Sequence, residues 1–156
     1  MKNKVLAFDF GASSGRAILA TYEDGKLTLE EMHRFSNDPV MVHGTFYWDV
    51  LRLFHEIKQG ILKCVNSGNG DITSIGIDTW GVDFGLLDQD GKLRETPVHY
   101  RDERTKGIMQ KVFEVIPQDE LYDKTGIQFL DINTLYHLYS LKLNRPDVLE
   151  RAETLL

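Results

Sequence analysis

The sequence predicts an α/β fold with a mixed sheet, in which antiparallel N-terminal strands precede a helix and further strands, and the last third is mostly helical. Three observations support this prediction. Short apolar runs joined by glycine-containing turns fill the first 35 residues. One long segment with helical periodicity follows. A strand-like apolar run comes directly after that helix, and a strand–helix–strand order favours a parallel pair within the same sheet.

The first third of the chain is predicted to form three strands, at residues 5–10, 16–22 and 26–35. Residues 11–15 are a turn of small residues, and Asp24-Gly25 is a hairpin signal. Because both connections are short, the three strands are expected to run antiparallel to one another.

A helix is predicted next, with Asp49 as its N-cap and residues 67–70 as its end. Its apolar residues recur at helical spacing: Val50, Leu53, Phe54, Ile57, Ile61, Leu62 and Val65. Residues 72–78 then read as a buried, mostly β-branched strand, and residues 82–87 as another.

The last third is expected to contain helices at 105–115, 118–124 and 135–143. Pro117 and Pro146 mark boundaries, and Gly126 is the expected terminator of the second helix. The chain ends in the apolar pair Leu155-Leu156, which we interpret as the cut end of a longer domain.

Composition excludes several classes of function. The chain has 156 residues, 42% hydrophobic, and a formal net charge of -6, which argues against a nucleic-acid partner because such proteins usually present a basic face. No apolar run approaches the roughly 18 residues needed to cross a bilayer, so no membrane partner is expected. The single cysteine, Cys64, cannot form an intramolecular disulfide, which fits a cytoplasmic protein, and we expect it to serve packing.

The first candidate site is Asp9-Phe10-Gly11-Ala12-Ser13-Ser14-Gly15-Arg16, where a carboxylate at a strand end precedes a turn of small residues. Small residues let backbone N–H groups approach a phosphate closely, while serine hydroxyls and Arg16 add donors. Asp9 could hold magnesium, directly or through water. The segment contains neither GxxxxGK[ST] nor GxGxxG, which argues against a P-loop or a Rossmann site. The alternative is a plain hairpin, since Gly, Ser and Asp are common in turns.

The second candidate site is Asp78-Thr79-Trp80-Gly81-Val82-Asp83, at the end of a predicted strand, where ligands collect in open α/β sheets. Trp80 offers a stacking face for a sugar, and Gly81 permits close approach of the backbone. Asp78 and Asp83 offer acceptors for hydroxyls or for the water shell of a metal. The alternative is a turn with a core tryptophan.

Two further segments contain polar or amide side chains next to predicted helices. In His99-Tyr100-Arg101-Asp102-Glu103-Arg104, Asp102 either caps the following helix or lies with Arg101 at the rim of a substrate cleft. The apolar loop with amides at residues 126–133, which contains Phe129, indicates little by itself.

Together these segments resemble the FGGY carbohydrate kinases, a family within the sugar kinase, Hsp70 and actin superfamily. Residues 9–16 are similar to the first phosphate motif of the family, and Ser13-Ser14-Gly15-Arg16 has the form associated with its members that phosphorylate L-rhamnulose. Residues 74–84, 100–102, 125–129 and 133–136 continue the resemblance in the same order, so that it covers nearly the whole chain.

The resemblance implies a two-domain kinase, each domain built on a ribonuclease-H-like core, with ATP and a sugar bound in the cleft between them. Asp9 is expected to work with magnesium, and Gly81 to contact the sugar. The resemblance also implies that Trp80, Asp83 and Phe129 are neighbours of the sugar. The residues expected to line the ATP phosphates are Ala12, Ser13, Ser14, Gly15 and Arg16. The expected reaction moves the γ-phosphoryl group of ATP to the 1-hydroxyl of L-rhamnulose.

One departure from the family concerns length, because its members are much longer than 156 residues. The chain is therefore expected to be the N-terminal part of domain one, with the rest of that domain and all of domain two absent. The catalytic aspartate is expected beyond residue 156, so none of Asp9, Asp78 and Asp83 is given that role and this part alone is expected to be inactive. The full-length protein is expected to be a monomer or a homodimer.

Three alternatives stay open. The first is a kinase for another ketose or polyol, such as L-fuculose, D-xylulose or glycerol, although Gly81 leaves room and adds no charge, which favours a larger deoxysugar. The second is a non-catalytic nucleotide-binding domain of the actin or Hsp70 kind, which would not need the segment Trp80-Gly81-Val82-Asp83. The third is an interaction module, which would not need Asp9 beside a Ser/Gly turn.

Overall fold

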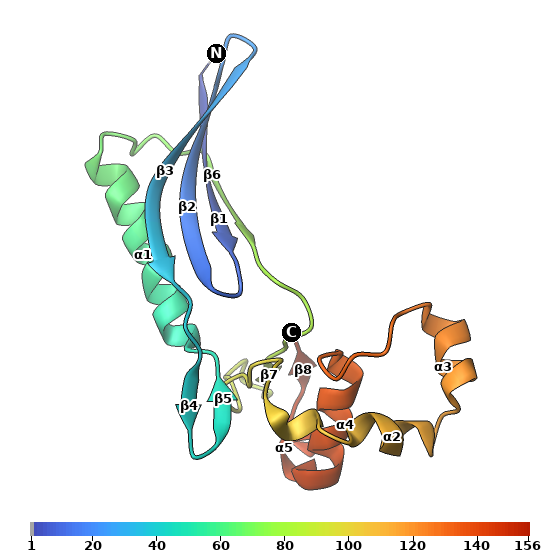
Figure 1. Cartoon of the computed structure of the whole chain (residues 1–156). Helices are drawn as coiled ribbons and strands as arrows, with labels where there is room; N and C mark the ends of the chain where they lie inside the picture. The colour runs from blue at the N-terminus through green and yellow to red at the C-terminus, as the bar shows by residue number, and fades with distance from the viewer. Residues whose placement is uncertain (1) are drawn as a thin grey trace. The chain divides into compact units, whose positions relative to one another are not determined.

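The computed structural model describes residues 2–156 and divides the chain into two compact units (Figure 1). Unit 1 comprises the described residues up to Asp38 together with Asp49–Gly81. Unit 2 comprises Pro39–Trp48 together with Val82–Leu156. Each unit therefore draws on two separate stretches of the chain.

Unit 1 is built on a four-stranded sheet with the strand order β3-β2-β1-β6. Strands β1 (Asn3–Phe10), β2 (Ser14–Glu23) and β3 (Lys26–Ser36) pair antiparallel, whereas β6 (Ser74–Asp78) pairs parallel with β1. A parallel pair needs a crossover connection, and helix α1 (Val50–Asn66) lies within that connection. The prediction of a mixed sheet with a parallel strand after the helix is confirmed, whereas the prediction that this strand is buried is wrong, because all five residues of β6 are exposed.

Of the two turns that flank β2, the sequence predicted the one after it correctly and the one before it only in part. Asp24 and Gly25 both have positive φ, 50° and 78°, as a two-residue hairpin loop requires, so the hairpin prediction is confirmed. The predicted turn at residues 11–15 is too long, because Ser14 and Gly15 already pair with β3 and belong to β2.

The core of unit 1 lies between α1 and one face of the sheet (Figure 1). Side chains of β1 alternate between the two faces, and every second one faces the core. The buried core residues are Leu6, Phe8, Phe10, Ala17, Leu19, Phe35 and Cys64. Burial raises the pKa of the Cys64 thiol, and its buried position agrees with the packing role expected from the sequence.

The apolar periodicity of helix α1 predicted only part of the face that packs on the sheet, since Leu53, Ile57 and Ile61 lie on that face as expected. The fully buried positions are Glu56, Gly60 and Cys64, with Leu53, Ile57 and Ile61 packed beside them. Phe54, Leu62 and Val65, which share the apolar spacing, are instead 59%, 50% and 47% exposed. The face of α1 that packs on the sheet therefore carries Glu56, whose carboxylate is paired, and Gly60, instead of two large apolar residues.

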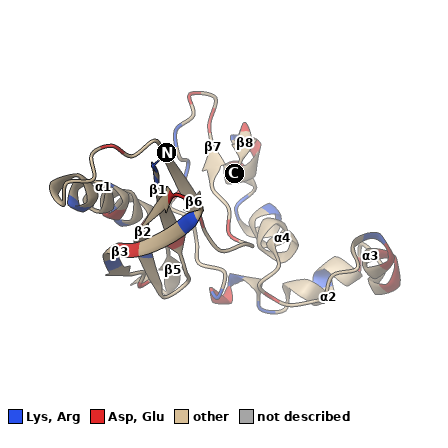
Figure 2. Cartoon of the chain, turned by 90° about the horizontal axis from the view of Figure 1, so that it is seen from above, with Lys and Arg blue, Asp and Glu red and all other residues tan. Residues whose placement is uncertain are grey.

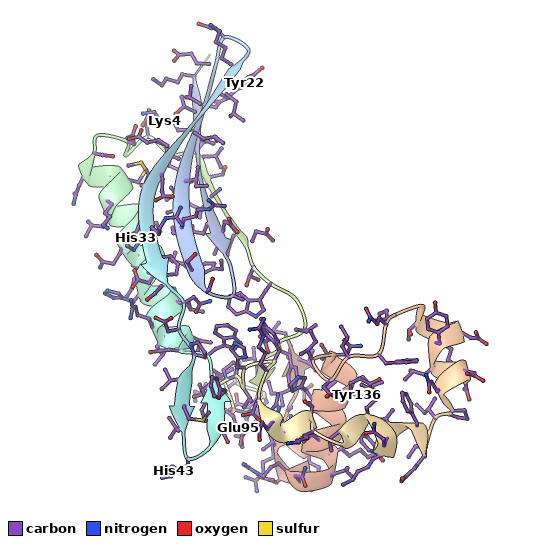
Figure 3. The ribbon with its side chains drawn as sticks, viewed as in Figure 1. Lys4, Tyr22, His33, His43, Glu95 and Tyr136 are labelled. Carbon is purple, nitrogen blue, oxygen red and sulfur yellow. The ribbon has the colours of Figure 1, made fainter. Side chains whose placement is uncertain are left out.

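The buried carboxylate of Glu56 joins α1 to β3. Strand β3 carries charges of both signs (Figure 2), and His33 projects from it on the α1 side (Figure 3). Glu56 lies 2.6 Å from His33 Nε2 and accepts a hydrogen bond from Arg52 Nε at 2.6 Å. Burial opposes the charge of Glu56, but these two partners outweigh burial and hold the pKa of its carboxyl below the usual range.

Gly60 is required by the close packing of α1 on the sheet, which leads to a test of the core. A Cβ at this position would lie 2.7 Å from the Phe8 ring and 3.0 Å from the Ala17 Cβ. We expect Gly60→Ala to lower the free energy of unfolding by about 1–3 kcal/mol, although alanine is the better helix former by roughly 1 kcal/mol. Denaturant unfolding measures the difference. The control is Gly76→Ala, since a Cβ on Gly76 meets nothing within 4 Å, and equal stability of the two variants would contradict the packing described.

Unit 2 combines short helices with two small two-stranded antiparallel sheets, of which only β4–β5 is a hairpin. Helix α2 (Ile108–Phe113), α3 (Gln118–Thr125) and α4 (Thr134–Asn144) share a core that includes Ile108, Val112, Leu121 and Tyr136. A second cluster joins Leu86, Leu141 and Val148. The other elements are β4 (Val40–Val42), β5 (Thr45–Tyr47), β7 (Leu86–Leu87), the 3-10 helix η1 (Glu103–Thr105), α5 (Pro146–Glu150) and β8 (Thr154–Leu155).

Two predictions for unit 2 need correction, and one hairpin was missed. The strand expected at 82–87 is reduced to β7, because Val82 has a φ of 69° that no strand allows. The single helix expected at 105–115 is divided into η1 and α2 by Gly107, whose φ is 73°. The β4–β5 hairpin was not predicted, and it turns at His43 and Gly44, both with positive φ.

The end of α3 was predicted correctly, and the boundary expected at Pro146 is confirmed, although the helix α5 that begins there was not predicted. Gly126 takes the left-handed conformation directly after α3, and Pro146 is the first residue of α5. Across residues 2–156, none of the helices combines the length and the apolar character that a bilayer span needs.

Candidate functional site

The small-residue turn between β1 and β2 is held closed by three hydrogen bonds. The Gly11 N–H donates to the Ser14 carbonyl at 2.9 Å. Asn37, buried directly after β3, donates from its backbone N–H to the Ser13 carbonyl at 3.0 Å and from Nδ2 to the Gly11 carbonyl at 2.9 Å. The turn is therefore fixed from two sides, as a backbone cradle for an anion requires.

Position 15 requires a glycine because of packing, and not because of its backbone angles. A Cβ at Gly15 would lie 2.2 Å from the Phe35 ring, which packs in the core of unit 1. The glycine therefore lets the aromatic ring pack directly beneath the turn. This close approach was not foreseen, since no local pattern pairs Gly15 with Phe35 before the β2–β3 register is known.

Asp9 and Arg16 face each other across β1 and β2, which pair these two positions directly. Arg16 Nε and Nη2 both donate to Asp9 Oδ2, at 3.0 Å and 2.8 Å. Both side chains are close to half exposed, at 47% and 44%, so the pair contributes little to folding. Because both donors use the same oxygen, Arg16 does not engage Asp9 Oδ1.

Asp9 also lies beside Asp78, because the parallel register of β1 and β6 pairs them. Neighbouring strands are about 4.8 Å apart, so two carboxylates end side by side at the same edge of the sheet. Mg²⁺ prefers such oxygen ligands and keeps several waters of its own, and this pair therefore fits a magnesium ion held partly through water. Among residues 2–156, no group of three or more His, Cys, Asp or Glu side chains is placed to form an all-protein metal site.

Trp80 and Gly81 end the stretch of chain that follows β6 in unit 1. Trp80 is partly buried and packs against the unit 1 core. A Cβ on Gly81 would meet no atom within 4 Å, and its φ is not in the left-handed region. Neither folding nor packing within the described residues therefore requires a glycine at position 81.

Asp83 holds a buried tryptophan of unit 2. Its Oδ2 accepts a hydrogen bond from Trp48 Nε1 at 2.6 Å, and Trp48 is only 1% exposed. The Trp48 ring stacks on His99 at 4.2 Å, and His99 stacks on Tyr100 at 4.5 Å. Burial and the nearby Arg101 lower the pKa of His99. Asp83 thus orients an aromatic stack, a role that the sequence did not reveal.

Asp102 and Arg104 form a second buried polar group in unit 2. The two oxygens of Asp102 accept the backbone N–H groups of Phe46, at 2.8 Å, and Arg104, at 3.0 Å. The prediction that Asp102 caps the next helix is therefore confirmed for η1. Arg104 Nε donates to His137 Nδ1 at 2.9 Å, and burial lowers the pKa of Arg104.

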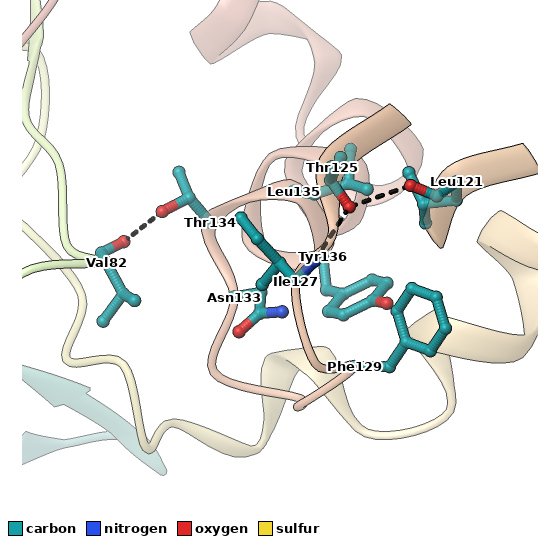
Figure 4. Close-up of a pocket in the computed structure, with 9 residues that line it drawn as sticks. All are labelled: Val82, Leu121, Thr125, Ile127, Phe129, Asn133, Thr134, Leu135 and Tyr136. Carbon is teal, nitrogen blue, oxygen red and sulfur yellow. Dashed lines mark hydrogen bonds between the residues drawn. The ribbon is translucent and has the colours of Figure 1, made fainter. Parts of the chain in front are cut away.

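Unit 2 also contains a pocket of about 260 Å³ between α3, the following loop and the start of α4 (Figure 4). Its side chains are mostly apolar, and Phe129 packs edge-on against Phe113 with ring centres 5.2 Å apart. Thr134 Oγ1 donates to the Val82 carbonyl at 2.7 Å and ties the segment after Gly81 to α4. The apolar lining residues are Val82, Leu121, Ile127, Phe129 and Leu135, the polar ones are Thr125, Asn133 and Thr134, and Tyr136 adds an aromatic ring with a hydroxyl group.

The structure brings only some of the expected site residues together. In unit 1, Asp9 and Arg16 join the small-residue turn, and Asp78 lies beside Asp9. In unit 2, Asp83 and Phe129 lie in different surroundings, the aromatic stack and the pocket. Asn37 and Trp48 were missed. The β2–β3 register shifts between Ala17 and Ile18, so extending the predicted hairpin register does not bring Asn37 to Ser13. No local signal pairs Trp48 with Asp83.

The chain matches known proteins along almost its whole length. Residues 4–156 match the model of the FGGY family of carbohydrate kinases, N-terminal domain. A rhamnulokinase from Oceanobacillus iheyensis is 48% identical over 151 residues, which cover 97% of this chain and 32% of that protein. A rhamnulokinase from Bacteroides thetaiotaomicron is 46% identical over 156 residues, which cover 100% of this chain and 32% of that protein. The chain thus spans about a third of the length of these curated relatives.

Solved structures show a similar fold. The structure of gluconate kinase from Lactobacillus acidophilus superposes with a TM-score of 0.84 at 18% identity, over 100% of this chain and 31% of that one. The structure of ligand-bound xylulose kinase from the same organism gives 0.81 at 19% identity, over 98% of this chain and 31% of that one. The predicted α/β fold with a mixed sheet, of the actin, Hsp70 and sugar-kinase type, is therefore confirmed.

Proposed function

Because this chain belongs to the FGGY family of carbohydrate kinases and matches the model of its N-terminal domain, we propose that the full-length protein transfers the γ-phosphoryl group of ATP to L-rhamnulose. The product is L-rhamnulose 1-phosphate. The observation that carries this proposal is the 48% identity to a rhamnulokinase over nearly the whole chain. A cytoplasmic setting, where ATP and sugar are both present, goes with the proposal.

The small-residue turn supports the ATP half of the proposal. Backbone N–H groups and hydroxyls from Ala12 to Gly15 would receive the phosphates of ATP, and Arg16 would add a positive charge. Asn37 keeps the turn in one conformation, which reduces the ordering needed when a phosphate binds. Asp9 and Asp78 would hold magnesium through oxygen and water. When bound, magnesium neutralises charge on the phosphate oxygens.

The sugar half rests on the segment after β6. Gly81 has no packing role in the described residues, so its small size is available for a ligand, and Trp80 lies next to it in sequence. Phosphoryl transfer depends mostly on positioning and electrostatics, and the residues of this chain would supply both. Asp9, Asp78 and Asp83 are given no role as the base for the attacking hydroxyl.

A substrate panel tests the proposal. ADP release by the full-length protein is measured with L-rhamnulose, L-fuculose, D-xylulose and glycerol in the presence of magnesium and ATP. We expect the largest kcat/KM for L-rhamnulose. A larger kcat/KM for another sugar would support the kinase activity but contradict L-rhamnulose as the substrate. If folded protein releases no ADP in a sugar-dependent way, a nucleotide-dependent switch is favoured instead.

Gly81 offers a second test, on the sugar alone. We expect Gly81→Val to raise the KM for the sugar by about tenfold or more, since a branched side chain would occupy space next to the substrate, on the scale of a lost contact in a tight site. The KM for ATP and the melting temperature should change little, because the added atoms meet nothing within the chain. Gly76→Val is the matched control, with open space of the same kind on β6. An unchanged KM for the sugar would remove Gly81 from the site.

A further inference from the structure

We propose that the apolar pocket of unit 2 receives the methyl end of a 6-deoxyketose, and so makes the enzyme select against sugars that carry a hydroxyl at carbon 6. This inference rests on the proposed sugar kinase function. It adds a specificity site, which begins at Val82, the residue directly after Gly81 in the chain.

The first argument is the chemistry of the pocket wall. Val82, Ile127 and Phe129 present carbon atoms to the interior (Figure 4), and apolar side chains supply most of the lining. At about 260 Å³ the pocket is smaller than typical sites for drug-sized ligands, which begin near 300 Å³. It therefore suits a small apolar group on a monosaccharide better than a large ligand.

The second argument is that most polar groups of the pocket already have partners; among the described residues, the Tyr136 hydroxyl and Asn133 Oδ1 are the lining groups whose hydrogen bonds do not enter this count. Thr125 Oγ1 donates to the Leu121 carbonyl at 2.8 Å and accepts the Ile127 N–H at 3.3 Å. Thr134 Oγ1 donates to the Val82 carbonyl at 2.7 Å, and Asn133 Nδ2 donates to the Gln128 carbonyl at 2.8 Å. A hydroxyl that enters the pocket would lose its water and find few groups to replace it, whereas a methyl group loses nothing.

The third argument is the backbone of Val82. Its φ of 69° lies in the left-handed region, which is unfavourable for a β-branched residue and favourable for asparagine or glycine. An asparagine or glycine at position 82 would suit this backbone conformation better but would remove the apolar side chain from the pocket wall. The apolar side chain of Val82 therefore stands at a position where the backbone alone would favour a polar or absent one.

L-Rhamnulose and L-fructose differ only at carbon 6, where the first has a methyl group and the second a hydroxymethyl group. The kcat/KM of the full-length protein is measured for both sugars. We expect a preference of about 10- to 100-fold for L-rhamnulose, the range that an apolar pocket achieves against an added hydroxyl.

Two variants place a polar amide in the wall. Val82→Asn suits the left-handed backbone and should fold at least as well as the parent protein, and Ile127→Asn changes a side chain that is more than half exposed. Both should lower the preference by about fivefold or more, on the scale of one hydrogen bond supplied to the hydroxyl. The control is Leu130→Asn, on the same loop but outside the pocket, which should leave the preference unchanged.

The outcomes separate this inference from the proposed function. Turnover of L-rhamnulose with equal kcat/KM for L-fructose would overturn the pocket assignment and leave the kinase intact. A preference that neither asparagine variant changes, or that Leu130→Asn changes equally, would also overturn it, and would indicate that another part of the protein fills the pocket. Absence of turnover with both sugars would overturn the proposed function, and this inference with it.

Discussion

Replacing Asp9 by asparagine is expected to lower the kcat of the full-length protein by about 100- to 1,000-fold, the scale found when one group that stabilises transition-state charge is removed. Asp9 would lose its charge where magnesium and the ATP phosphates meet, beside Asp78 and Arg16. Stability should change by less than about 1 kcal/mol, because the Asp9–Arg16 pair is close to half exposed. Steady-state kinetics with varied magnesium and a melting curve measure the two effects separately.

The control for Asp9→Asn is Asp71→Asn. Asp71 accepts a hydrogen bond from Lys4 Nζ at 2.7 Å and is also an exposed carboxylate of unit 1 with a basic partner, but it lies away from the turn. It should leave kcat unchanged. If the kcat of Asp9→Asn also stays within about threefold of that of the parent enzyme, or if the two variants lose equal activity, Asp9 has no role at the phosphate site.

The largest expected effect on stability comes from acid and acts through His137. This side chain is 1% exposed, and burial, aided by the charge of Arg104, lowers its pKa to about 4. Arg104 Nε donates to His137 Nδ1 at 2.9 Å, so the folded protein holds the neutral ring with its proton on Nε2. Asp102 partly offsets the charge of Arg104, and His99 adds to it.

The sign of the effect follows from proton binding. An unfolded histidine titrates near pH 6.5, so below that pH the unfolded chain binds a proton that the folded protein refuses. The contribution of His137 is fully present above about pH 6.5 and is lost progressively down to about pH 4. We expect the free energy of unfolding to fall by about 2–3 kcal/mol from this residue between about pH 7 and about pH 4.5.

Denaturant unfolding at several pH values, compared with His137→Gln, isolates this effect. Glutamine can still accept the hydrogen bond from Arg104 but does not titrate, so its stability should depend less on pH by the amount expected for His137. His55→Gln, at an exposed position on α1, is the control and should keep the pH dependence of the parent protein. The same dependence in His137→Gln and the parent protein would show that His137 is not the residue that resists protonation.

The sheet of unit 1 could be predicted because its signals are local. The Asp24-Gly25 turn fixes the β2–β3 hairpin, and the apolar alternation of β1 fixes which face is buried. The face of α1 could be predicted only in part, because Glu56 is buried through His33, which lies 23 residues earlier, and no helical pattern contains that pairing. Phe54 and Leu62 satisfied the apolar periodicity and are nevertheless exposed.

The candidate site divides in the same way. The position of Asp9 before a turn of small residues is visible in eight consecutive letters, and the turn formed nearly as expected. Asn37 and Asp78 reach the same region only through strand pairing, so their contribution depends on register. The pocket around Phe129 depends on the packing of α3, a loop and α4, and no spacing in the sequence encodes that arrangement.

The central proposal is tested most directly by the identity of the product. The full-length protein is incubated with magnesium, ATP and L-rhamnulose, and the phosphorylated sugar is identified by mass spectrometry and phosphorus NMR. We expect one ADP for each L-rhamnulose 1-phosphate formed, with no product when the sugar is omitted. ADP formation that does not depend on the sugar, or a folded protein that makes no sugar phosphate from any ketose tested, would contradict it.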